Sequence, residues 1–173
     1  RGGGDSPEID NFLHFGCRAH FFSGMREKFV VSYKLTDFDD PPKNELSIRT
    51  ALQRFFSDNS QLQAQALLDY GPITSWDTGN VTNMIQLFGK FPNFNQDISN
   101  WNVSNVTTMF SMFSGCRNFN NGQDPNNSTK PLNWDVSKVV DMETMFFNAQ
   151  NFNQDISSWD VSNVRNMNRM FFL

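Results

Sequence analysis

The chain has 173 residues, which is enough for one domain with at most a small appendage. Its formal net charge of −4 and pI of about 5.0 exclude the basic excess that binding to nucleic acid or to an anionic membrane usually requires. The sequence contains no run of 18 apolar residues, so no membrane-spanning helix is expected in it.

Residues 1–43 are expected to form a partly irregular leader with one strand, in the apolar stretch KFVVSYKL at 28–35. The leader holds both histidines of the chain, but Cys17 and His20 lack a second ligand pair at zinc-finger spacing. Cys116 lies far along the chain from Cys17, so the two cysteines indicate neither a disulfide framework nor a metal site.

A short acidic run in the leader also falls short of a metal site. Asp37, Asp39 and Asp40 offer oxygen ligands, yet the run lacks the glycine and the closing glutamate of a calcium loop. A solvated acidic turn is the simpler interpretation. We therefore predict no metal and no cofactor.

Residues 44–70 are expected to form a helical cap. Leu46, Ile48, Leu52 and Phe55 follow a helical period, the SDNS cluster at 57–60 interrupts it, and a second helix is expected from there to Gly71. An array of repeats needs a cover with one polar face over its first copy, and a helical pair supplies one.

Residues 71–173 consist of four repeats, which the tryptophans mark. Trp76, Trp101, Trp134 and Trp159 are 25, 33 and 25 residues apart, and the longer interval contains an insertion at 121–130. The sequence around the tryptophans recurs, as in FNQDISNWNVSNVTTMF from Phe94 and FNQDISSWDVSNVRNM from Phe152. A unit this short cannot bury its own apolar face, so the copies are expected to stack.

Two apolar periods within each repeat predict its secondary structure. Around Trp101 and Val103 the apolar residues alternate, which is typical of a short strand. From Val106 the spacing of Met109, Met112 and Phe113 is helical. The helix N-caps are expected at Thr78, Ser104, Ser137 and Ser162, and Gly89 and Gly115 lie past the helix ends. The predicted fold is therefore an α/β repeat solenoid, whose leucine-rich-repeat-like coils each hold one short parallel strand and one short helix, behind an N-terminal helical cap.

Like residues should form columns through such a stack. One column would hold the tryptophans, and others would hold the isoleucines before them, the Met and Phe residues after them, and Phe94, Phe119 and Phe152. In the third repeat Pro131 falls where the pattern has isoleucine, and Leu132 is expected to substitute for it.

The consensus FNQDISxWDVSNVTxM resembles the BspA-like repeat family, also called the lipoprotein-associated or Mycoplasma-type surface-protein repeat. The resemblance covers Tyr70 to Leu173. It implies a leucine-rich-repeat-like solenoid with a role in adhesion or protein binding, and it carries no catalytic residues to transfer.

Two polar ladders are candidates for function. The residues after the four tryptophans, Asp77, Asn102, Asp135 and Asp160, are expected on one outer face, where they could receive a basic partner or simply keep that face hydrated. The amides of the FNQD segments, at 95–97 and 153–155, are expected to bond from coil to coil or to turn backbone, which is a structural role.

Two further features bear on location. Among the N-glycosylation motifs, only Asn126 and Asn127 fall in the insertion, where a glycan would not disturb the stack. The chain starts at Arg1-Gly2-Gly3-Gly4 without an initiator methionine, so processing or truncation is expected to have removed sequence. An extracellular or cell-surface location is favoured, with an organelle or a virion as the alternative.

The sequence contains no hydrolase elbow, zinc-protease helix or phosphate loop, so we expect no enzyme. The favoured function is a non-enzymatic repeat scaffold that mediates protein–protein or surface-polymer binding. The alternative is a structural accessory subunit built permanently into a larger assembly, such as an organellar complex or a virion. Protein partners are expected in both cases, without nucleic acid and without a membrane span.

Overall fold

The computed structural model describes residues 34–36, 45–124, 126 and 131–173. The other residues, which include Cys17, His20, Asp37, Asp39 and Asp40, lie outside the described part. Most of the strand expected at 28–35 also lies outside it.

The described chain begins with two short strands that pair in parallel. Strand β1 (Lys34–Thr36) aligns with β2 (Glu45–Ser47), with Leu35 paired in register with Leu46. The N–H of Leu35 donates to the carbonyl oxygen of Asp77 at 2.9 Å. Strand β1 is thereby joined to the first repeat.

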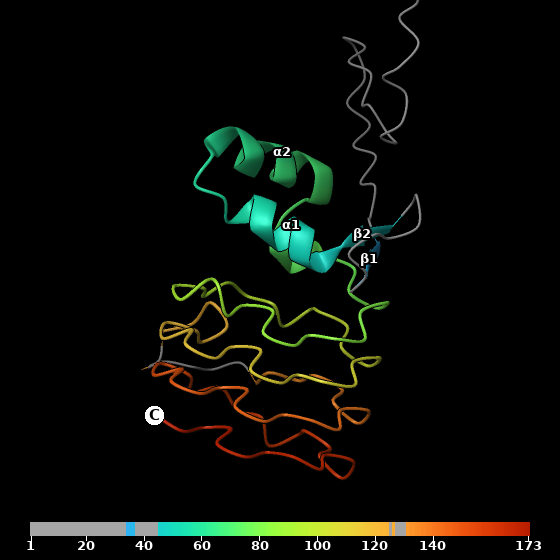
Figure 1. Cartoon of the computed structure of the whole chain (residues 1–173), viewed down its shortest axis with the longest axis vertical. Helices are drawn as coiled ribbons and strands as arrows, with labels where there is room; N and C mark the ends of the chain where they lie inside the picture. Colours follow the sequence, from blue (N-terminus) through green and yellow to red (C-terminus); the bar gives the residue numbers. More distant parts are fainter. Residues whose placement is uncertain (1–33, 37–44, 125, 127–130) are drawn as a thin grey trace, which may run out of the picture. The chain divides into compact units, whose positions relative to one another are not determined.

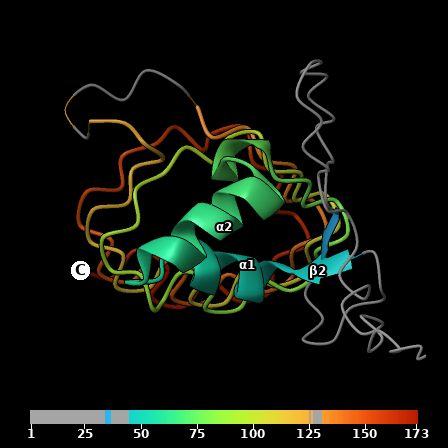
Figure 2. The ribbon, with the colours of Figure 1, turned by 90° about the horizontal axis from the view of Figure 1, so that it is seen from above.

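Two helices follow and cover the first repeat (Figures 1 and 2). Helix α1 (Ile48–Phe55) buries Ile48, Ala51 and Leu52, and its end places Phe55 edge-on against Trp76 at 5.7 Å between ring centroids. Helix α2 (Ser60–Tyr70) starts at Asn59, whose Oδ1 accepts hydrogen bonds from the N–H groups of Gln61 and Leu62. This helix buries Ala66 and Tyr70, and the hydroxyl of Tyr70 accepts a hydrogen bond from Arg54 of α1.

The repeats form four stacked layers at 72–97, 98–124, 131–155 and 156–173, which follow nearly the same outline when seen from above (Figure 2). Backbone hydrogen bonds join each layer to the next. In the first layer the N–H groups of Met84, Gln86 and Phe88 donate to carbonyl oxygens of the second layer at 2.9–3.0 Å. Equivalent bonds join the second layer to the third, and the third to the fourth.

The predicted solenoid of strand-plus-helix coils is wrong. Within the described residues after η1 (Ile73–Ser75), a single turn of 3₁₀-helix, the chain forms no α-helix and no extended strand. Parallel pairing between layers is limited to isolated bridges that link Asn83, Thr108, Asp141 and Asn166 in turn.

Tight turns take the place of the expected helices. In the first layer the N–H of Leu87 donates three residues back to the carbonyl of Met84, and the third residue of that turn, Gln86, has a φ of 50°. Ser111, Thr144 and Arg169 repeat this conformation with φ of 52–53°. A positive φ at this position is typical of a type II turn and cannot belong to a right-handed helix. A helix of two turns is marginal in isolation, so bonds to the neighbouring layer win.

The expected strands are also absent, although their burial pattern is right. Trp101 and Val103 are buried and Asn102 between them is exposed, but the N–H of Trp101 closes a turn onto Ile98 instead of pairing with another layer. Alternating burial predicts which side chains face inward. It does not distinguish a strand from an extended corner between two turns.

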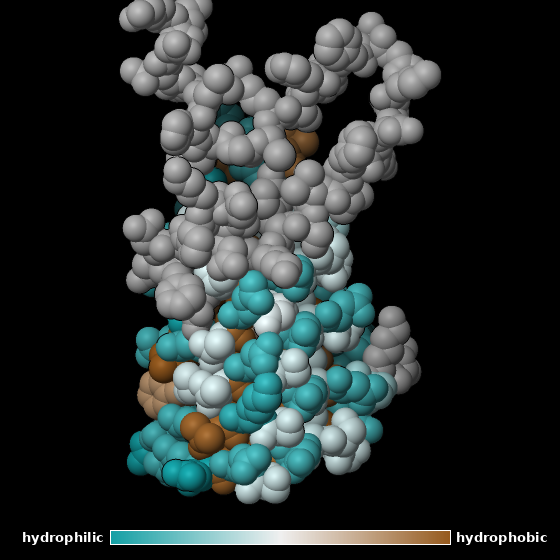
Figure 3. Space-filling model, turned by 90° about the vertical axis from the view of Figure 1, so that its right-hand side faces the viewer, coloured by the Kyte–Doolittle hydropathy of each residue, from teal (hydrophilic) through white to brown (hydrophobic). Residues whose placement is uncertain are grey.

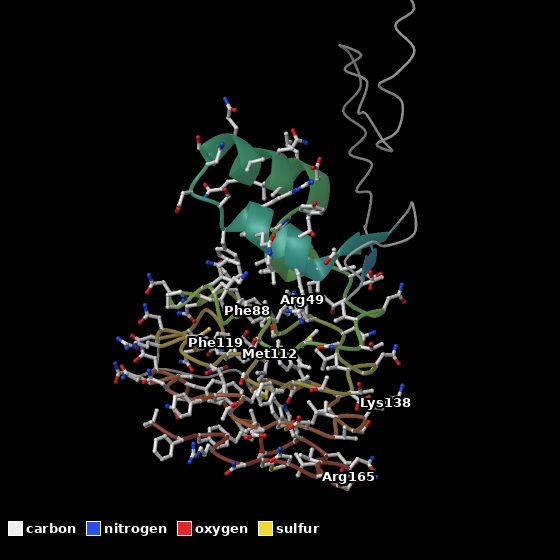
Figure 4. All side chains as sticks on the ribbon, viewed as in Figure 1. Arg49, Phe88, Met112, Phe119, Lys138 and Arg165 are labelled. Atoms are coloured by element: carbon white, nitrogen blue, oxygen red, sulfur yellow. The ribbon has the colours of Figure 1, made fainter. Side chains whose placement is uncertain are left out.

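Aromatic rings stack from layer to layer in the core, and Figure 4 labels two of them, Phe88 and Phe119. The rings of Phe88, Phe113, Phe146 and Phe171 lie 5.0–5.5 Å apart and within 6° of parallel. Each of the first three also stacks at 3.9 Å on a phenylalanine of its own layer, and these partners are Phe94, Phe119 and Phe152.

The tryptophans form a second buried column that is fixed by hydrogen bonds. The indole N–H of Trp101 donates to the carbonyl of Ile73 at 2.9 Å, and that of Trp159 donates to the carbonyl of Leu132 at 2.7 Å. Leu132 is fully buried and thus occupies the isoleucine position of the third layer. The tryptophans of the second, third and fourth layers therefore each tie their layer to the one before, whereas the indole of Trp76 donates to the carbonyl of Gly71 after α2.

Candidate functional site

The predicted polar row follows the tryptophan column at one corner of the stack. Asn102, Asp135 and Asp160 are exposed and Asp77 is half-buried. In each case Oδ1 accepts the backbone N–H two residues later, at 3.0–3.1 Å. This bond is an Asx turn, in which the side chain holds the corner of the backbone. The row therefore has a local structural role in every layer.

Serine hydroxyls add a second bond in the middle of the row. The hydroxyl of Ser104 donates to Oδ1 of Asn102 at 2.8 Å, and that of Ser137 donates to Oδ1 of Asp135 at 2.6 Å. Among the described residues, every hydrogen bond to these side-chain oxygens goes to Oδ1. The second carboxylate oxygen of each aspartate is left for solvent or a partner.

The turn bonds favour the ionised form of two members of the row, Asp135 and Asp160. Hydrogen bonds from the hydroxyl and N–H of Ser137 lower the pKa of Asp135, with a smaller contribution from the charge of Lys138. The same pair of groups on Ser162 lowers the pKa of Asp160, whereas the neighbouring charge of Asp135 opposes the shift. Asp135 and Asp160 lie in neighbouring layers, and their charges interact. The row therefore carries adjacent negative charges.

The surroundings of the row are polar. Lys138 donates through Nζ to Oδ1 of Asn105 at 2.7 Å, and Asn105 in turn donates to the carbonyl of Gly79 at 2.8 Å. The side of the molecule that carries Lys138 and Arg165 in Figure 4 is largely hydrophilic over the layers, with small separate apolar patches (Figure 3). A hydrated face of this kind suits a polar partner.

The amide ladder is structural, as predicted. Oδ1 of Asn95 accepts the N–H groups of Asn120 and Gly122 in the next layer at 2.8 and 2.9 Å. Oδ1 of Asn120 accepts the N–H of Asn153 and the side-chain amide of Gln154 at 2.8 and 2.9 Å. These bonds join backbone and side-chain groups across three layers.

The other candidate residues are placed as follows. Asn126 is exposed beside Asp124, and Asn127 lies outside the described residues. Cys116 is a buried free thiol that donates to the carbonyl of Phe88, and burial raises its pKa to about 12. In the described segments, no three His, Cys, Asp or Glu side chains gather around a point where a metal ion could bind. None of the described helices combines the length and apolarity needed to cross a membrane.

The serines that bond the row are expected from the sequence to be helix N-caps. This prediction is wrong for Ser104, Ser137 and Ser162, and also for Thr78, because none of the described residues after them forms an α-helix. The signal was present in the Asp/Asn-x-Ser spacing, since an Asx residue with serine two positions later is typical of a side-chain-stabilised turn.

Comparison with known proteins gives a family and no function. No curated protein matches the chain, and no solved structure matches it. A family model described as "Mycoplasma protein of unknown function, DUF285" matches residues 50–173, which include α2, most of α1 and all four layers. The chain therefore belongs to the family of Mycoplasma proteins of unknown function DUF285.

Proposed function

We propose that the protein is a non-enzymatic repeat scaffold of the BspA-like surface-protein type, which binds a basic segment of a partner protein through Asp77, Asn102, Asp135 and Asp160. The observation that supports the proposal is the fixed geometry of this row. Each layer sets one Asx side chain at the same corner by the same hydrogen bond. The layers are held in register by their backbone bonds.

The spacing and charge of the row suit an extended basic segment. Parallel backbone bonding between layers sets a rise of about 4.8 Å, so neighbouring carboxylates repeat at a distance that Lys or Arg side chains can match. The carboxylates are already oriented by their turns, and a partner therefore loses little by ordering them. An adhesive role at a cell surface follows from the same proposal.

A matched pair of variants tests this role. Asp135→Asn with Asp160→Asn removes two charges, while the amide keeps the turn, as Asn102 does in the second layer. The control is Asp97→Asn with Asp155→Asn, which removes the same charge from Asx turns at a different corner. Both variants should fold with unchanged near-ultraviolet circular dichroism.

Binding of a ten-residue lysine peptide is then measured by titration calorimetry at 50 and 300 mM salt. The row variant should bind roughly threefold to thirtyfold more weakly than the wild type, because exposed ion pairs are individually weak. The control variant should bind nearly as well as the wild type, and all affinities should fall at 300 mM salt. Equal loss in the two variants would assign the effect to net charge and overturn the proposed role of the row.

A permanent structural subunit is the second candidate, and the outer surface of α2 favours it. Leu67 and Leu68 are 52% and 81% exposed there. Exposed leucines on a short helix are typical of a surface that is covered in an assembly. Mass determination of the natively purified particle separates the two functions, since a permanent subunit stays with its partners at fixed stoichiometry through salt washes.

A further inference from the structure

A cleft of about 380 Å³ lies between α1 and the first two layers. Helix α1 contributes Arg49 and Gln53 to its wall, and the second layer contributes Ser111 and Ser114. Figure 4 places Arg49 where α1 faces the first layer. The volume lies within the range of sites for small molecules.

The cleft exists because one column of the repeat changes size. In the third and fourth layers this column holds Phe147 and Phe172, whose rings stack at 5.6 Å and within 7° of parallel. The first two layers carry Gly89 and Ser114 at the equivalent positions, and both line the cleft. Two missing phenyl rings thus leave space under α1.

The charge in the cleft is positive. Arg49 and Lys90 line it, and among the described residues of its wall none carries a carboxylate. Arg54 on the same helix approaches Asp69 at 4.0 Å, whereas in the described part of the chain no carboxylate lies within ion-pair distance of Arg49 or Lys90. Two unpaired cations at one opening attract an anion.

The donors of Arg49 are held in position and remain available. Its Nη2 donates to the carbonyl of Ile85 at 2.8 Å, which orients the guanidinium. A guanidinium has five N–H donors, so most of them are left for a ligand. Arg49 can therefore bind a carboxylate in a fixed geometry.

The rest of the wall is neutral and mixed. The side chains of Gln53, Gln86 and Ser114 offer amide and hydroxyl groups, and the hydroxyl of Ser111 is fixed by its 2.6 Å hydrogen bond with Thr144. Leu87 and Phe91 add apolar surface. A ligand that matches this wall has one negative group, several hydroxyls and an apolar face, which excludes a bare inorganic anion as the best fit.

We propose that this cleft binds an acidic sugar of the uronate class. Its carboxylate would accept hydrogen bonds from Arg49 and Lys90, its hydroxyls would bond to the amides and to Ser114, and its ring carbons would contact Phe91. The cleft and the acidic row share no residue, so the proposal does not depend on the partner of the row. Loss of one site leaves the other testable.

The test uses the full chain and D-glucuronate, with glucose and inorganic phosphate as comparison ligands, in calorimetric titrations and thermal shift assays. Ser114→Phe should abolish glucuronate binding, because the introduced ring would lie over Phe147 as Phe172 does and fill the cleft. Lys90→Gln should weaken binding about tenfold. Lys138→Gln removes the same charge from a residue that bonds Asn105 elsewhere, and it should leave binding unchanged.

Each outcome is decisive. Glucuronate binding at least tenfold tighter than that of glucose or phosphate, lost in Ser114→Phe with the folded spectrum retained, supports the proposal. The absence of glucuronate binding at about 10 mM ligand would overturn the proposal. Phosphate binding as tight as glucuronate binding, or glucuronate binding that survives Ser114→Phe, would also overturn it. Equal losses in Lys90→Gln and Lys138→Gln would reduce the effect to net charge, which also overturns it.

Discussion

Replacement of Phe113 by alanine tests whether stacking between layers stabilises the chain. Phe113 is fully buried, with Phe88 5.0 Å from its ring on one side and Phe146 5.5 Å on the other. It also stacks at 3.9 Å on Phe119 of its own layer. Removal of the ring therefore opens the centre of the stack.

The expected loss follows from the buried area. A phenylalanine buries about 200 Å², which at about 25 cal/mol per Å² gives about 5 kcal/mol. Measured Phe-to-Ala changes in cores give about 3 to 5 kcal/mol. We therefore expect Phe113→Ala to lower the free energy of unfolding by about 4 kcal/mol, a large part of the roughly 5 to 15 kcal/mol that holds a domain folded.

The chain supplies its own control in Phe171, the equivalent residue of the fourth layer. Phe171 stacks on Phe146 at 5.4 Å but is 52% exposed, so it buries about half as much area. Phe171→Ala should therefore cost about 2 kcal/mol. The two substitutions are chemically identical, but Phe113 has a layer on both sides and a stacked partner in its own layer, whereas Phe171 stacks only on rings of the layer before it.

Urea denaturation followed by tryptophan fluorescence measures both variants, because the tryptophan column adjoins these rings, with Trp134 6.4 Å from Phe113. With a slope of about 2 kcal/mol per M, the midpoint should fall by about 2 M for Phe113→Ala and by about 1 M for Phe171→Ala. Phe113→Leu, a smaller change, gives the same ranking if the alanine variant fails to fold. Equal shifts for positions 113 and 171 would refute the stacking argument.

Two further predictions concern ionisation. The lowered pKa values of Asp135, Asp155 and Asp160 mean that their ionised forms stabilise the folded chain above the unfolded pKa of about 3.9, and that this stabilisation is lost as the pH falls through the lower folded-state pKa. The Tm of the wild type should stay level from about pH 7 to 5 and drop below about pH 4. The drop should be smaller in the double variant Asp135→Asn with Asp160→Asn, and an identical drop in the two proteins would contradict this origin. Burial raises the pKa of the Cys116 thiol to about 12, so this thiol should resist iodoacetamide at pH 8 until urea unfolds the chain. Peptide mass spectrometry measures the labelling, and rapid labelling of the native chain would contradict the burial of the thiol.

The sequence predicts the inward side chains well because burial repeats with the motif. Trp101, Met109, Met112 and Phe113 are all buried, and so are their equivalents in the third layer. These positions follow from the recurrence of like residues alone, since each copy must cover the next. Identification of the core did not require the correct backbone conformation.

Backbone conformation was the part that sequence reasoning missed. The spacing of Val106, Met109, Met112 and Phe113 fits one face of a helix, and it fits equally a series of tight turns with one inward residue each. The residue that distinguishes the turn from a helix is Ser111, whose φ is 53°. A glycine or an asparagine at this position would have indicated a positive φ, whereas a serine does not. Gln86, Thr144 and Arg169 at the same position give no better warning.

Tertiary bonding explains why such residues accept a left-handed conformation. Each costs about 1 kcal/mol relative to glycine, but the turn frees the N–H groups of Met84, Gln86 and Phe88 to bond to the next layer. Three bonds for one strained residue, repeated at each junction, favour the stacked turns over an isolated helix. The balance depends on neighbouring copies and is therefore invisible within a single repeat.

The same dependence on neighbours indicates where function is to be sought in this chain. Positions that repeat unchanged, such as the tryptophans, hold one layer to another and are constrained by that task. Positions that vary within a column are not constrained by this task of holding the layers together. Asn102 in the acidic row is one example, and Gly89 and Ser114 in the column of Phe147 and Phe172 are another. The first variation dilutes a row of charge while it keeps the turn, and the second opens a cleft while it keeps the stack. Both change the surface without a cost to the core, which is why the row and the cleft are the two places where a ligand is expected.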